Sequence, residues 1–188
     1  MNGIARDNTE LDVAKDHFGK EFKRRAPWMI LSVVAGATMI WVGQSYEEIL
    51  SKKIQLVFFI PMIVYMSDTI GAETLGLFIR ELALRRVSIV HLFFKETLVG
   101  ISLGIISGVP MGIFSYLLFR DTKIAFVIMT AMIVNGMIAV LIGMIIPIMF
   151  NKYRSDPAVG SSEISTALSD NLSMLVYLIV ATLILFGI

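Results

Sequence analysis

The chain has 188 residues, of which 56% are hydrophobic and 16% charged, and its mean hydropathy is +0.80. These values lie far from those of an ordinary soluble domain and indicate an integral membrane protein. The formal net charge of +1 gives no reason to expect a nucleic-acid partner. Because the sequence has no cysteine, disulfides, thiolate metal sites and thiol redox chemistry are excluded.

The N-terminal segment, residues 1–25, alternates acids and bases and has no apolar core. Its charged residues recur at helical spacing, which predicts a cytoplasmic juxtamembrane helix lying on the inner membrane surface. A cytoplasmic plug is the alternative interpretation. The remainder, residues 26–188, is predicted to be one membrane domain with short connections.

The first two apolar segments differ in character. The first runs from about Ala26 to Gly43, with Pro27 at the favourable first-turn position of a helix. The second begins near Ile54 and is apolar until it meets the polar run of residues 67–73, Ser-Asp-Thr-Ile-Gly-Ala-Glu. Two acids and a glycine in mid-span predict a broken or locally unwound helix, which is tolerated where it lines a polar cavity.

Three more spans follow, so the predicted fold is an all-α membrane protein with five transmembrane helices. The third, roughly Phe93 to Phe119, carries glycines four residues apart, which let another helix approach closely. The fourth runs from Ile124 to Phe150 and includes Asn135, which is expected to form an interhelical hydrogen bond. The fifth begins near Ser161. The glycines of the third span are Gly100, Gly104, Gly108 and Gly112.

Asp170 lies inside the fifth apolar segment. A carboxylate within a membrane helix costs at least about 2.5 kcal/mol, so by default it marks an ion or substrate path. Helical spacing places Glu163, Thr166, Asp170 and Ser173 on one face. Because Lys95, at the very start of the third span, is the only Lys, Arg or His within the five spans, none is expected to pair with Asp170. The sequence therefore predicts a transporter or channel.

The distribution of basic residues predicts the orientation of the spans. With the N-terminus inside, most Lys and Arg beside the spans are also inside, which gives an N-in, C-out topology. The exceptions are Lys52, Lys53, Arg120 and Lys123.

Several motifs in the same order resemble one family over about residues 26–188. The run Asp156-Pro-Ala-Val-Gly-Ser161 follows Pro147 and precedes the helix of Asp170. The pair Pro61 and Gly71, the run Ile79-Arg-Glu-Leu-Ala-Leu84 and the pattern Lys95-Glu-x3-Gly-x3-Gly104 occur before it. Together they resemble the MgtE family of magnesium channels and their eukaryotic solute-carrier relatives.

This resemblance implies a five-helix bundle that works as a homodimer in the plasma membrane of a prokaryote. It places the ion path near the two-fold axis, with Asp170 of each subunit facing it. Two such carboxylates supply the charge that balances one divalent cation, and magnesium keeps most of its waters. Thr166, Ser169 and Asn171 are expected to help hold the hydrated ion. The transported Mg²⁺ or other divalent cation is the expected partner besides lipid, with no cofactor.

One stretch departs from the family pattern. Where members typically carry a neutral Gly-Asn-Ala-Gly-x-Gln run, this chain has Asp68-Thr-Ile-Gly-Ala-Glu73. Asp68 and Glu73 are therefore additional candidate metal ligands, although five residues of helix separate them by roughly 140°. Alternatives are transport of calcium or manganese, sodium- or proton-coupled exchange, and a non-transporting membrane assembly subunit. The sequence has no catalytic motif, and we expect no enzyme activity.

Overall fold

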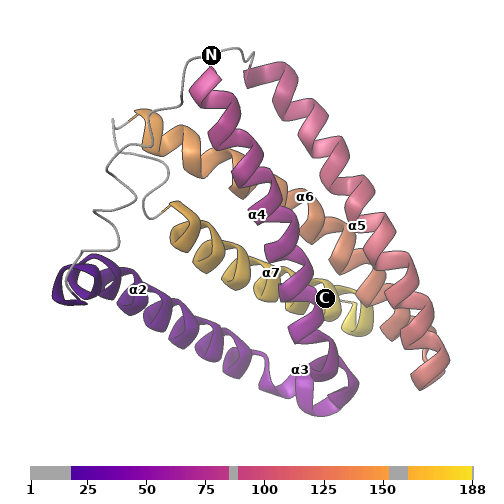
Figure 1. Cartoon of the computed structure of the whole chain (residues 1–188). Helices are drawn as coiled ribbons and strands as arrows, with labels where there is room; N and C mark the ends of the chain where they lie inside the picture. The colour runs from indigo at the N-terminus through magenta and orange to yellow at the C-terminus, as the bar shows by residue number, and fades with distance from the viewer. Residues whose placement is uncertain (1–17, 85–88, 153–160, 188) are drawn as a thin grey trace.

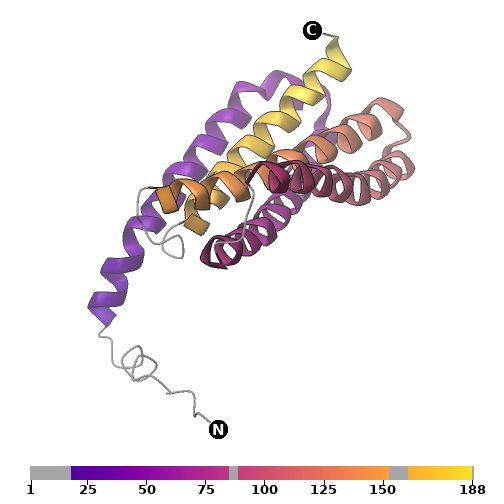
Figure 2. The same cartoon turned by 90° about the horizontal axis from the view of Figure 1, so that it is seen from above.

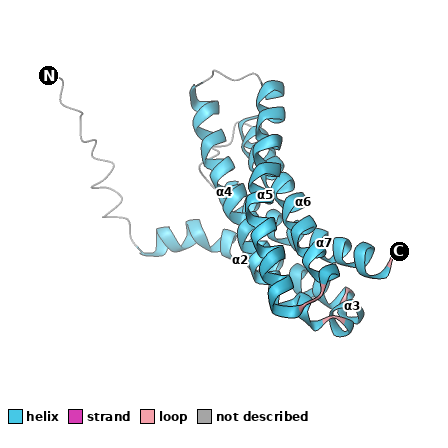
Figure 3. Ribbon diagram, turned by 90° about the vertical axis from the view of Figure 1, so that its right-hand side faces the viewer, coloured by secondary structure: helices cyan, strands magenta, loops and turns pink. Residues whose placement is uncertain are grey.

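The computed structural model describes residues 18–84, 89–152 and 161–187. All regular structure within these ranges is helical (Figure 3). Five long helices each contain a stretch that is long and apolar enough to cross a membrane, which confirms the predicted fold class. They are α2 (Phe18–Ser45), α4 (Ile60–Leu84), α5 (Ile89–Phe119), α6 (Thr122–Lys152) and α7 (Ser161–Phe186), and the short α3 (Glu47–Lys52) and η1 (Ile54–Phe59) join α2 to α4.

Helix α6 is the centre of the bundle. It packs against α5 on one side and against α4 and α7 on the other (Figure 1). Helix α2 is outermost and contacts mainly α7, as the view from above also shows (Figure 2). Most side chains along α2 are therefore at least partly exposed, and lipid would cover its outer face.

The first helix starts earlier than predicted. Helix α2 begins at Phe18, so Pro27 lies inside it rather than in its first turn. The residues before Pro27 include Lys, Glu and Arg, which are good helix formers and extend the helix beyond the apolar segment. Residues 18–25 are thus continuous with the first span. The remainder of the predicted juxtamembrane helix, residues 1–17, lies outside the described residues.

The prediction of a broken second span was wrong, because α4 is helical without interruption from Ile60 to Leu84. Its threonines bond within the helix: Thr69 Oγ1 donates to Tyr65 O at 2.9 Å, and Thr74 Oγ1 donates to Ile70 O at 2.9 Å. Gly71 packs directly against α6, since a Cβ built there would lie 3.5 Å from Ala139 O. Neighbouring helices and local hydrogen bonds accommodate the polar residues, so the helix need not unwind.

The glycines of α5 bring its backbone against that of α6, as predicted. A Cβ added at Gly100 would lie 2.6 Å from Gly136 O, and one added at Gly104 would lie 2.7 Å from Ile133 Cα. Both distances are shorter than any ordinary carbon contact. The two helices can therefore pack this closely only while these positions of α5 carry no side chain.

A polar layer separates two apolar clusters in the core. The hydroxyl oxygens of Ser67 and Ser169 lie 3.3 Å apart, Asn135 Nδ2 donates to Ser173 O at 3.1 Å, and the Ser173 hydroxyl donates to Ser169 O. Asn135 thus forms the predicted interhelical hydrogen bond. The larger cluster comprises Leu56, Phe59, Ile63, Ile124, Val127, Ile128, Ala131, Met132, Met174, Tyr177, Leu178 and Ala181, and the smaller one Ile70, Phe78, Ala139, Val140 and Met144.

Asp121 ties the start of α6 to the segment before α4. Its Oδ1 accepts the backbone N–H groups of Lys123 at 2.9 Å and Ile124 at 3.3 Å, while Lys53 Nζ contacts its Oδ2 at 2.8 Å. The hydrogen bond from Lys53 holds the pKa of Asp121 below its ordinary value. A lowered folded-state pKa stabilises the protein above the unfolded-state pKa of about 4, and this stabilisation is lost as pH falls through the folded-state pKa.

We expect Asp121→Ala to lower the free energy of unfolding by about 1–2 kcal/mol at pH 7, since it removes a helix cap and a partly exposed ion pair. Asp121→Asn keeps a capping oxygen and should lose less. The measurement is thermal unfolding in detergent from pH 7 down to the lowest pH at which the protein is still folded. A penalty for Asp121→Ala that does not shrink below about pH 4 would contradict the assigned ion pair.

Candidate ion-binding site

The carboxylates of Asp68 on α4 and Asp170 on α7 lie near each other where these two helices pack together. Thr166 Oγ1 of α7 donates to Asp68 Oδ1 of α4 at 2.9 Å. Asp170 is one turn further along α7 than Thr166 and on the same side of that helix, which places it near Asp68. Tertiary packing therefore brings together three of the predicted ligands, from segments about a hundred residues apart in the chain.

Asp170 itself is incompletely satisfied. Its Oδ1 is buried and has no hydrogen-bond partner within the described structure. A buried acceptor without a partner costs free energy, and more so when it is charged. Such an oxygen is suited to a cation, or to the water shell that a cation brings with it.

A small cavity adjoins this carboxylate between α2 and α7, with a volume of about 100 Å³. That volume exceeds what a single water needs. The α2 side presents small side chains around Ala35, while α7 contributes the polar ones. The lining residues are Ser32, Ala35, Gly36, Met39, Thr166, Ala167, Asp170 and Asn171.

Asn171 fixes α7 against α2 at the same level. Its Nδ2 donates to Ala35 O at 3.1 Å and to Ala167 O at 2.8 Å. Its Oδ1 is buried and, among the residues that the structure describes, has no hydrogen-bond partner. The side-chain amide therefore has its donor occupied and its acceptor available beside the cavity.

The remaining predicted ligands, Ser169 and Glu73, lie elsewhere in the chain. Ser169 is buried in the polar layer, bonded to Ser67 rather than lining the cavity. Ser173, predicted only to share a helix face with Asp170, is also buried in the polar layer and does not line the cavity. Glu73 is exposed and lines a separate open hollow on α4 that also includes Arg80. Asp68 and Glu73 are thus not brought together by the fold of the chain.

Two features of this region were not evident from the sequence. The contribution of α2, through Ser32 and Ala35, was missed, although small residues at positions 32, 35 and 36 follow helical spacing. Glu96 of α5 is a second missed acid: it is only 7% exposed, and its carboxylate lies 3.4 Å from Lys95 Nζ. Because Glu96 lies at the start of a span, where polar and apolar residues alternate, the sequence did not indicate that its side chain is buried.

The chemistry of this arrangement fits a hydrated cation better than a bare one. In the parts of the chain that the structure describes, no three His, Cys, Asp or Glu side chains converge on one point. When both are ionised, Asp68 and Asp170 nevertheless provide two negative charges beside hydroxyl and amide oxygens. Magnesium is commonly held in this way, by one or two carboxylates with several waters retained.

Comparison with known proteins identifies related sequences. The family model of MgtE, described as a divalent cation transporter, matches residues 60–180. The magnesium transporter MgtE of Bacillus subtilis is 32% identical over 162 residues, covering 85% of this chain and 36% of that protein. Those of Enterococcus faecalis and Thermus thermophilus are 29% and 26% identical, covering 87% and 86% of this chain and 37% and 36% of their own lengths. The chain spans about a third of the relatives it matches.

Proposed function

Since this chain belongs to the MgtE family of divalent cation transporters, we propose that it conducts a divalent cation, magnesium first among them, across a membrane. The ion passes the carboxylates of Asp170 and Asp68, aided by Thr166 and Asn171. The three relatives are named magnesium transporters, which supports this choice of ion. The family description is that of a transporter rather than an enzyme.

The observation that carries the proposal is the unpartnered oxygen of Asp170 at the cavity between α2 and α7. A carboxylate kept within a span with a buried oxygen that has no hydrogen-bond partner destabilises the fold, so a functional role is its most direct explanation. Asp68 adds a second charge next to it instead of a compensating base. Both features favour an ion path over a structural contact.

We further propose that the working unit is a homodimer. One protomer leaves a long outward face of α4 exposed, including Glu73 and the open hollow that it shares with Arg80. A second copy packed against this face would bring Glu73 nearer the path and double the number of carboxylates. The mass of the purified protein in mild detergent tests this part of the proposal.

The proposed setting is the plasma membrane of a prokaryote, with the N-terminus inside and the C-terminus outside. The distribution of Lys and Arg beside the spans supports the orientation. Lys53 forms an ion pair with Asp121, which directly follows Arg120, at one end of the bundle. Two of the basic residues expected outside, Lys53 and Arg120, therefore lie at the same end. Labelling of single cysteines on either side of the membrane would establish the orientation, because the chain has none of its own.

The experiment that tests the function is ion flux into liposomes that contain only this protein. We expect magnesium flux well above that of protein-free vesicles, with calcium, manganese, cobalt and sodium compared under the same gradient. Sodium should pass at least about tenfold more slowly than magnesium, since a doubly charged site binds a divalent ion more strongly than a monovalent one. Equal rates for all five ions, or sodium exceeding magnesium, would contradict the proposed selectivity.

Paired variants separate the two acids of α4. Asp68→Asn should lower magnesium flux about tenfold or more and change the ratio of magnesium to calcium or manganese flux, because Asp68 is beside Asp170. Glu73→Gln serves as the matched variant and should change the ratio less, since Glu73 lines a different hollow. A larger effect for Glu73→Gln than for Asp68→Asn would place the path along the outer face of α4.

A further inference from the structure

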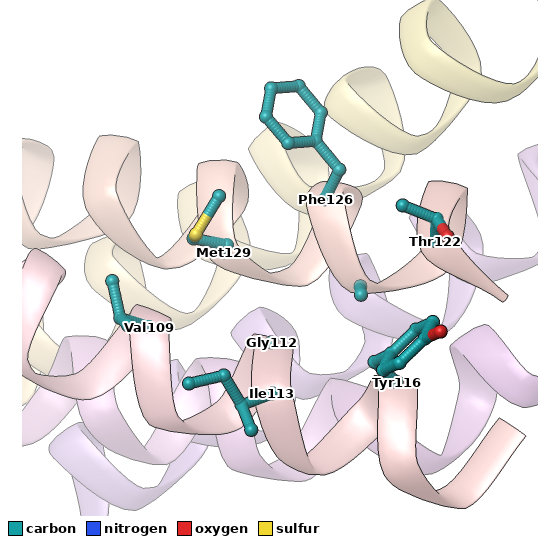
Figure 4. A pocket seen from close by; sticks show the side chains of 8 residues that line it. Val109, Gly112, Ile113, Tyr116, Thr122, Phe126 and Met129 are labelled. Carbon is teal, nitrogen blue, oxygen red and sulfur yellow. The ribbon is translucent and has the colours of Figure 1, made fainter. Parts of the chain in front are cut away.

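A second cavity lies on the surface between α5 and α6, apart from the ion-binding cavity. It is an open groove with a volume of about 430 Å³ (Figure 4). The floor of the groove is formed by Gly112 and Ala125, which lack long side chains. The two helices are close together there, because a Cβ built at Gly112 would lie 3.1 Å from Ala125 O. Ile113 of α5 and Phe126 of α6 project beside it and are 57% and 52% exposed. The groove is therefore apolar and lies on the exposed surface of the bundle.

The groove extends along the third and fourth candidate spans from the end at which they join. Its outer end is formed by Tyr116 and Thr122, close to where one span ends at Phe119 and the next begins. Its inner end is at Val109, about two helical turns or 10 Å deeper along α5. This depth matches the upper part of one lipid acyl chain within a single leaflet.

Two basic residues, Arg120 and Lys123, flank the outer end of the groove in the chain. The guanidinium of Arg120 lies 5.9 Å from the ring centroid of Tyr116, and Lys123 is exposed immediately after Thr122. Neither takes part in an ion pair within the described ranges, 18–84, 89–152 and 161–187. The nearest acid in sequence, Asp121, is already paired with Lys53. Arg120 thus brings one uncompensated positive charge to the mouth of the groove, and Lys123 carries a second one directly after the lining residue Thr122.

We propose that this groove is a binding site for an anionic phospholipid. One acyl chain lies on the floor over Gly112 and Ala125, and the phosphate contacts Arg120 and Lys123. A zwitterionic lipid would fill the apolar part equally well but would bring no net charge to the mouth. Basic pockets at the ends of membrane helices recognise anionic headgroups in this way. The proposal does not depend on which ion the protein carries.

The test uses a fluorescent reporter in the groove wall of the full chain. The two native tryptophans, Trp28 and Trp41, are replaced by phenylalanine, and Phe126→Trp provides the single emitter. The protein is reconstituted into vesicles containing either dibrominated phosphatidylglycerol or dibrominated phosphatidylcholine at equal mole fractions, and quenching is measured. We expect phosphatidylglycerol to bind roughly fivefold more strongly at this position.

Arg120→Gln with Lys123→Gln, in the same background, should reduce this preference to about one, because the headgroup contacts are lost. The matched control is Lys52→Gln, which removes a basic residue that is paired with Glu48 instead. It should leave the preference unchanged. Equal quenching by both lipids before the double substitution, or an unchanged preference after it, would overturn the proposal. Weak quenching by both lipids would also overturn it, because a protein surface would then fill the groove.

Discussion

Asp170→Asn should reduce divalent-cation flux in reconstituted vesicles by about a hundredfold or more while leaving the fold intact. A carboxylate near a divalent ion at an effective dielectric constant of about 20 contributes several kcal/mol, and a loss of only about 2.7 kcal/mol already accounts for a hundredfold change. The thermal stability should stay the same or rise, because the substitution removes the charge of a carboxylate whose Oδ1 is buried and has no hydrogen-bond partner. Activity and stability should therefore change in opposite directions.

The matched control for this result is Glu48→Gln. Glu48 is also a carboxylate, but it is exposed on α3 and paired with Lys52 at 2.6 Å, away from the cavity. Flux of the Glu48→Gln protein should equal that of the unchanged protein. Normal flux in Asp170→Asn would show that Asp170 is not a principal ligand and would remove the basis of the proposed ion path.

The second large effect concerns packing rather than transport. Gly136→Ala should destabilise the protein by about 3 kcal/mol or more, since overpacking a tight contact commonly costs about 1–3 kcal/mol and here both partners are backbone. The added Cβ would lie 2.5 Å from Gly100 O and 3.0 Å from Gly104 Cα. Neither atom can rotate away, so α5 and α6 would have to separate. Thermal unfolding in detergent measures the change.

Gly19→Ala is the control with the same chemical change. Gly19 is inside α2, and a Cβ built there meets no atom within 4 Å. Because alanine has a higher helix propensity than glycine, this substitution should be neutral or stabilise the protein by up to about 1 kcal/mol. Similar losses in both variants would mean that the glycines act through backbone entropy and not through the close approach of α5 to α6.

The sequence alone predicted the five spans, because a membrane helix is specified by a long apolar run that needs no knowledge of its neighbours. The glycine spacing of α5 predicted a close helix contact for a similar reason: side chains four residues apart lie on one face of any helix. Asp170 could also be recognised directly, since a carboxylate within an apolar segment is costly in any bilayer arrangement.

Tertiary structure decided which polar residues meet. Local composition suggested that residues 67–73 would break α4, but the hydroxyls of Thr69 and Thr74 and the packing of Gly71 on α6 keep the helix continuous. Ser169 and Asp170 are adjacent in sequence, yet one is buried in the core and the other faces the cavity, because consecutive residues differ by about 100° around a helix.

The same distinction holds for the acids of α4. Helical geometry separated Asp68 from Glu73, but only the placement of α7 showed that Asp68 is the one beside Thr166 and Asp170. The part played by α2 was equally inaccessible, because Ala35 contributes a backbone carbonyl to Asn171 and any residue has one. A long apolar run, or a charged residue within one, is a property of a single segment and can be predicted from the sequence of that segment alone. Contacts between helices depend on their mutual rotation and depth, which the packing of the whole bundle determines.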